Sequence, residues 1–94
     1  MELAWLQDFV ALQKERSFSR AARTRNVTQP AFSRRVRALE HWAGARLFER
    51  GSQGATLTAA GEVFARGAPD LLAQANALRA RTQEAGENAT GILR

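Results

Sequence analysis

The chain has 94 residues, which is enough for one small domain and too few for a second hydrophobic core. Its 45% hydrophobic and 24% charged residues are typical of a globular protein rather than a disordered one. The absence of cysteine excludes disulfides and thiolate metal sites, and a single histidine, His41, is too little for a zinc site. No paired carboxylates, nucleophile–base pair or glycine-rich phosphate loop is evident, so we expect neither an enzyme nor a cofactor. Without a long apolar run or a signal peptide, we expect no membrane partner and a cytoplasmic location.

The net charge of +5 is concentrated in one part of the chain. Residues 16–50 contain nine arginines and only two acidic residues, Glu40 and Glu49. Such a cluster favours binding to nucleic acid, because guanidinium groups pair with phosphates and with the edges of guanine. The alternative is an ordinary solvated surface, which usually carries acidic residues as well.

Three helices are predicted in the first half of the chain. Apolar residues recur at helical spacing over residues 2–15. Ser17 is expected to cap a second helix that ends near Arg25. After a short turn, Thr28 is expected to cap a third helix, with Pro30 in its first turn, where a missing amide hydrogen costs nothing.

The third helix is expected to bury one face and expose another. Its predicted buried stripe is Phe32, Val36, Leu39 and Ala43. The aromatic side chains of the chain are expected mainly in the core rather than at a stacking or cofactor site; they include Trp5, Phe32, Trp42, Phe48 and Phe64.

Beyond Gly44 the pattern changes to short strands. Residues 46–50 and 55–57 are extended candidates around a turn at 51–54, which predicts a small hairpin. Two isolated strands are marginal unless they pack on the helices, and such a packed hairpin is a wing.

A long helix is expected to follow from Thr58 to about Ala85, with a polar linker from 86 to 91. A heptad seam along it predicts pairing with a second copy, although packing within one chain is an alternative; the seam is Phe64, Ala68, Leu71, Ala75, Leu78, Thr82 and Ala85. Pro69 lies inside this helix, where it removes a hydrogen bond. Because the seam stays in phase across it, we expect one continuous helix with a bend near residues 65–69.

The exposed face of the third helix carries the side chains that a DNA-reading helix needs. Its N-terminal residues are expected to reach base edges in the major groove; the candidates are Thr28, Gln29, Pro30, Ser33, Arg34 and Arg37. Gln29 can bond adenine, and Thr28 caps an end that attracts phosphate. Arg50 and the turn at 51–54, with Gln53, are candidates for wing contacts with the backbone or minor groove, the alternative being a tight turn with a solvent-facing arginine.

Five motifs occur in the order and spacing of one known family. They are residues 17–22, 27–34, 39–40, 47–50 and 57–61, and together they resemble the LysR-type transcriptional regulators over residues 1–87. The resemblance implies a mostly α fold: a winged helix-turn-helix of three helices and a two-stranded wing, followed by a long dimerisation helix. It also implies an antiparallel homodimer of long helices that binds an interrupted palindrome in double-stranded DNA.

The resemblance implies roles for individual residues. Gln29, Pro30, Ser33 and Arg34 match the groove and backbone contacts of the family, and Arg50 matches the contact at the base of the wing. The dimer contacts are expected at Phe64, Ala68, Leu71, Ala75 and Leu78. The tip of the wing lacks the arginine or lysine of many relatives, which predicts a weaker grip on the minor groove.

The expected organisation has three parts. Residues 1–57 form the DNA-binding domain, 58–87 the dimerisation helix, and 88–94 a hinge to an effector-binding domain that the chain lacks. A small-molecule effector is then expected to act only through that domain, and the full-length protein to form a higher oligomer associated with the nucleoid. Two rivals are a regulator of another winged-helix family and a winged-helix module that binds proteins and no DNA.

Overall fold

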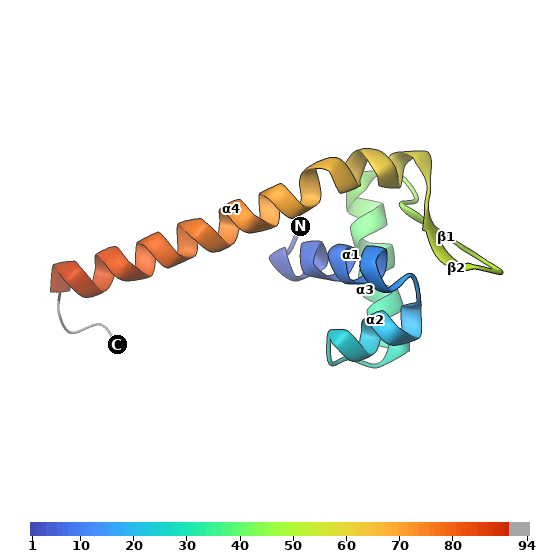
Figure 1. Ribbon diagram of the computed structural model, residues 1–94, viewed down its shortest axis with the longest axis horizontal. Coiled ribbons are helices and arrows are strands. Elements are labelled where there is room, and N and C mark those ends of the chain that lie inside the picture. Colours follow the sequence, from blue (N-terminus) through green and yellow to red (C-terminus); the bar gives the residue numbers. More distant parts are fainter. Residues whose placement is uncertain (91–94) are drawn as a thin grey trace.

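The computed structural model describes residues 1–90, and it confirms the predicted fold class. The elements are α1 (Leu3–Glu15), α2 (Phe18–Thr24), α3 (Gln29–Ala43), β1 (Phe48–Gly51), β2 (Gly54–Leu57) and α4 (Ala59–Thr90). Figure 1 shows α1, α2 and α3 gathered at one end of the molecule and α4 extending far beyond them. Residues 91–94, the end of the expected hinge, lie outside the described residues.

The helix ends follow local chemistry. The Ser17 hydroxyl accepts a hydrogen bond from the Arg20 amide at 3.2 Å, and the Thr28 hydroxyl accepts one from the Ala31 amide at 3.3 Å. Both caps satisfy amides that have no partner inside their helix. α3 ends at Gly44, whose φ of 83° is readily adopted only without a side chain.

The core lies where α1, α3, the wing and α4 meet. The Phe9 ring packs against Phe48 at a centroid distance of 5.1 Å and against Phe64 at 4.8 Å. Two predictions about α3 were wrong. Ala43 is exposed because α3 projects beyond the core at its C-terminal end, and Trp42 is 54% exposed for the same reason.

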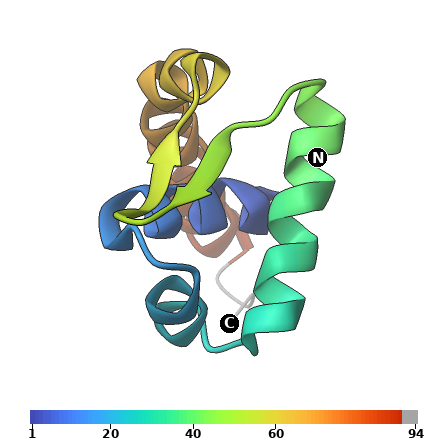
Figure 2. The ribbon, with the colours of Figure 1, turned by 90° about the vertical axis from the view of Figure 1, so that its right-hand side faces the viewer.

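β1 and β2 form the predicted antiparallel wing, which passes in front of α1 in Figure 2. The ladder pairs Phe48 with Leu57 and Gly51 with Gly54, so the two glycines belong to the strands and Ser52 and Gln53 make the turn. The first strand starts at Phe48 rather than residue 46, because the Glu40 carboxylate accepts from the amides of Leu47 and Phe48 at 2.7 and 3.1 Å. That carboxylate fixes the root of the wing to α3.

α4 starts beside the root of the wing. The Thr58 hydroxyl accepts from the Gly61 amide at 2.9 Å and caps the helix. A Cβ at Gly61 would collide with the carbonyl oxygen of Leu47, so the absence of a side chain lets the helix lie close to the loop before β1.

α4 is one continuous helix through Pro69, as predicted. Figure 1 shows its axis changing direction after the first turns, in the region where the sequence predicts a bend. The expected end near Ala85 was wrong, and residues 86–90 are helical rather than a linker. Gly86 alone costs about 1 kcal/mol relative to alanine, which is too little to end a helix whose neighbours are compatible with it. No helix within residues 1–90 is long and apolar enough to cross a membrane.

Candidate DNA-binding surface

The N-terminal turn of α3 presents most of its predicted contact residues to solvent. Thr28, Gln29, Pro30 and Arg34 are exposed, and Arg37 follows one turn later on the same helix. Pro30 occupies the first turn as predicted. This end of α3 therefore offers an amide, a small apolar ring and two cationic side chains without any carboxylate in the first two turns.

Ser33 departs from the prediction. It is only 9% exposed and does not share the open face of Gln29. Its hydroxyl accepts a hydrogen bond from Arg50 at 3.0 Å, because β1 folds back over this part of α3. Ser33 and Arg50, predicted as separate contacts, are thus partners of one another.

The wing residues lie beside α3. Arg50 is exposed on β1, and Gln53 is exposed in the turn. A groove between α3 and the wing is lined partly by Ser33, Arg37 and Arg50. Arg46 also lines this groove and was not among the predicted contact residues. Its place in the arginine-rich stretch 16–50 is the signal that could have identified it.

A buried acidic residue gives two arginines of the cluster a structural role. Asp8 on α1 is fully buried and accepts from Arg25 Nε at 2.7 Å and from Arg35 at 2.8 and 2.6 Å. Gln7 also accepts from Arg25, at 2.9 Å. Two of the nine arginines counted toward DNA binding therefore hold α2 and α3 onto α1. An acidic residue between the apolar positions Leu6 and Phe9 is the signal that could have revealed them.

The other cations of this surface are available. Within residues 1–90, no carboxylate lies within ion-pair distance of Arg34, Arg37 or Arg50. Arg46 lies 3.8 Å from the Glu40 carboxylate, and its side chain is 71% exposed. A polyanion approaching α3 and the wing would meet these cations without displacing a strong internal partner.

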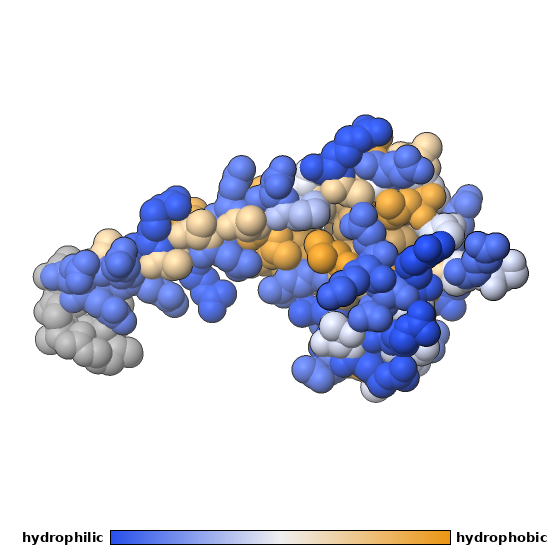
Figure 3. Space-filling view, viewed as in Figure 1, coloured by the Kyte–Doolittle hydropathy of each residue, from blue (hydrophilic) through white to orange (hydrophobic). Residues whose placement is uncertain are grey.

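The predicted dimer seam divides into two parts. Phe64 and Ala68 pack against the core of their own chain, so their burial needs no second copy. Leu71 and Leu78 are 48% and 58% exposed. Figure 3 shows apolar surface (orange) where α4 passes α1, with paler patches continuing along α4. Trp42 lies in the same apolar hollow as Leu71 and Met1.

Comparison with known proteins identifies the family. A family model described as bacterial regulatory helix-turn-helix protein, lysR family, matches residues 3–62. This chain belongs to the LysR family. The family consists of regulatory proteins, not enzymes, in agreement with the sequence analysis.

Relatives of this LysR-family chain include proteins of known structure. It is 52% identical over 64 residues to the HTH-type transcriptional regulator YjiE of Escherichia coli (strain K12), covering 68% of this chain and 21% of that protein. It superposes on Vibrio fischeri DarR in complex with DNA with a TM-score of 0.89 and 44% identity, covering 93% of this chain and 30% of that one. It superposes on the DNA-binding domain of BenM with catB site 1 DNA with a TM-score of 0.84 and 36% identity, covering 92% and 97%. The chain spans between about a fifth and three fifths of the length of the first curated relatives it matches.

Proposed function

We propose that this chain is the sequence-specific DNA-binding domain of a bacterial transcriptional regulator. One observation carries the proposal: the exposed N-terminal turn of α3, which has no carboxylate, lies beside a wing whose Arg50 pairs with no carboxylate of residues 1–90. In a winged helix-turn-helix, the second helix of the motif enters the major groove while the wing lies along the backbone. Gln29 and Arg34 then contact base edges or fix the position of α3 in the groove. Arg37, Arg50 and Gln53 contact the DNA backbone.

The binding unit in this proposal is a homodimer on an interrupted palindrome. Leu71, Ala75 and Leu78 form an apolar stripe on the part of α4 beyond the core, and a second copy of α4 would remove it from water. A two-fold protein requires two half-sites with matching symmetry. Effector sensing and any higher oligomer belong to a further domain in this proposal. Work on chromosomal DNA implies a cytoplasmic location at the nucleoid.

The relatives named above support DNA binding over the alternative of a protein-interaction module. Both matched structures are complexes with DNA, and the BenM chain is a DNA-binding domain that this chain covers almost completely.

A selection of bound sequences from random duplexes tests the proposal. We expect enrichment of a two-fold symmetric sequence, and a log–log plot of affinity against salt with a slope of about −0.9 per phosphate neutralised. A mixture without enrichment, together with affinity independent of salt, would instead support the protein-interaction module.

A further inference from the structure

One side chain joins the wing to both helices of the helix-turn-helix. The guanidinium carbon of Arg50 lies 3.7 Å from the centroid of the Phe18 ring, at the start of α2. Arg50 Nη2 also donates to the Ser33 hydroxyl on α3, at 3.0 Å. Phe18 in turn packs edge-on against Phe32 with a centroid distance of 6.1 Å. The position of Arg50 is therefore set by two contacts from two different elements.

These contacts leave most of the binding capacity of Arg50 unused. A guanidinium group has five N–H donors in one plane, and stacking on a ring occupies its face rather than its edge. Within residues 1–90 the Ser33 oxygen is the only acceptor of a hydrogen bond from Arg50, and no carboxylate pairs with Arg50. The Ser33 hydroxyl accepts from Arg50, so its own proton is free to be donated to another acceptor.

The remaining donors adjoin open surface. A hollow of about 250 Å³ lies between the start of α2, the start of α3 and the wing, and Arg50 lines it together with Phe18 and Gln29. The Gln29 side chain that is proposed to read a base thus borders the same space as Arg50. A group bound here would be fixed relative to the base-reading residue.

We propose that Phe18 and Ser33 are positioning residues that hold Arg50 ready to bind a phosphate of the DNA backbone. This inference rests on the proposed function. A free arginine side chain loses rotamer freedom when it binds, and that loss weakens binding. An arginine already held by an aromatic ring and a hydroxyl loses less, so the same phosphate is bound more tightly. Ser33 acts through Arg50 here, rather than by reading a base.

A double-mutant cycle on DNA affinity tests the proposal. The probe is a duplex carrying the sequence enriched in the selection above, with a shuffled duplex as the non-specific probe. Arg50→Gln should weaken binding on both probes, on the order of tenfold, and lower the salt slope by about one per subunit. Phe18→Leu should weaken binding about three- to tenfold, because it removes the ring that attracts the cation.

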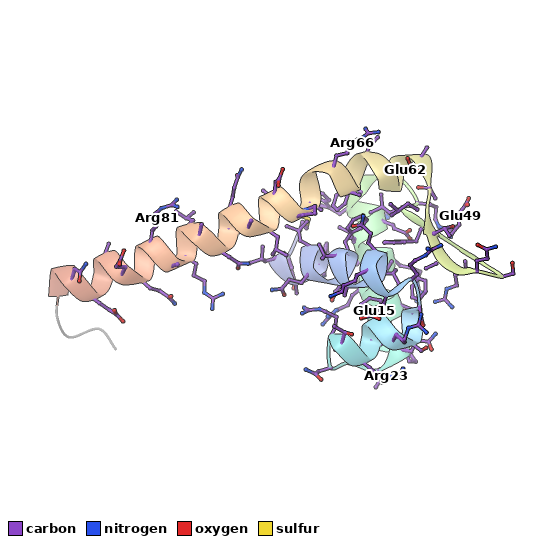
Figure 4. All side chains as sticks on the ribbon, viewed as in Figure 1. Glu15, Arg23, Glu49, Glu62, Arg66 and Arg81 are labelled. Atoms are coloured by element: carbon purple, nitrogen blue, oxygen red, sulfur yellow. The ribbon has the colours of Figure 1, made fainter. Side chains whose placement is uncertain are left out.

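The decisive comparison is the effect of each positioning variant with and without Arg50. In the Arg50→Gln background, Phe18→Leu and Ser33→Ala should each change affinity by less than about twofold. Phe18→Tyr should retain affinity, because it keeps the aromatic face. Arg81→Gln is the matched control, since Figure 4 shows Arg81 on the far part of α4, away from the wing; its effects should simply multiply with those of Phe18→Leu.

Two results would overturn the inference while leaving the proposed function intact. One is that Arg50→Gln binds the duplex as tightly as the wild-type protein does, while the affinity of the wild-type protein falls with salt as expected for DNA binding. The other is an equal loss from Phe18→Leu or Ser33→Ala in both backgrounds, which is what a merely structural role predicts. If Phe18→Leu fails to fold because it also packs on Phe32, the Ser33→Ala cycle decides. Absence of salt-dependent binding by the wild-type protein would instead refute the proposed function.

Discussion

Replacing Asp8 with alanine should destabilise the protein more than any other single loss of charge. The carboxylate is fully buried and carries the charge that Arg25 and Arg35 pair with. Removing one member of a buried ion pair typically costs about 3–5 kcal/mol, because the remaining charge loses its partner. Here the two arginine side chains keep 24% and 32% of their exposure and can turn toward water. We therefore expect a loss of about 2–4 kcal/mol in the free energy of unfolding.

Urea unfolding followed by circular dichroism measures this loss, at one fixed protein concentration because dimerisation contributes to stability. The matched control is Glu15→Ala. Glu15 also joins α1 to α2, through Thr24 at 3.3 Å and Arg20 at 3.7 Å, and Figure 4 shows it between these helices, but its side chain is 28% exposed. We expect this control to cost less than about 1 kcal/mol.

A second variant separates the lost charge from the lost contacts. Asp8→Leu combined with Arg25→Met and Arg35→Met replaces the buried charges by apolar side chains, and it should recover most of the stability. The reasoning is refuted if Asp8→Ala costs no more than Glu15→Ala. It is refuted equally if the triple variant is less stable than Asp8→Ala.

Three further predictions concern binding and assembly. Gln29→Ala should cost about 1–3 kcal/mol on the best duplex and relax base preference at one symmetric pair of positions; uniform weakening on all duplexes would assign Gln29 a positioning role only. Leu78→Glu should give a folded monomer in sedimentation, because Leu78 is 58% exposed in the single chain and only a partner is affected by the charge; a stable dimer would place the interface elsewhere. Pro69→Ala should stabilise α4 by up to about 3 kcal/mol and alter the preferred spacing of half-sites; unchanged spacing would contradict a role for the bend.

Local chemistry made the starts of the helices predictable. Ser17, Thr28 and Pro30 act within three residues along the chain, so their roles can be inferred without knowing the fold. The burial of Ser33 could not be inferred in this way, because it depends on where β1 returns over α3. The ion pairs of Arg25 and Arg35 could not be inferred from the sequence either. Asp8 lies 17 residues from Arg25 and 27 from Arg35, and only the packing of three helices brings them together.

The division of the heptad seam on α4 into a buried and an exposed part could also not be predicted without the fold. Its heptad spacing is the same for residues that face their own core and for residues that face solvent, so the sequence alone predicts one continuous interface. The structure separates Phe64 and Ala68, which pack against the core of their own chain, from Leu71 and Leu78 beyond them. Trp42 was assigned to the core because aromatic side chains usually lie there, yet the end of α3 leaves it at the edge of an apolar hollow.

The close packing at Gly61 lies near one end of a long helix, so a small change of angle there becomes a large displacement at the other end. The helix has 32 residues and a length of about 48 Å, and Gly61 holds it against the Leu47 carbonyl close to one end. A tilt of about 5° at this junction would move the far end of the helix by about 4 Å. A methyl group at residue 61 cannot occupy the space next to the carbonyl, so either α4 or the loop before β1 would have to shift. A side chain at residue 61 would therefore change the direction in which the far part of α4 leaves the core.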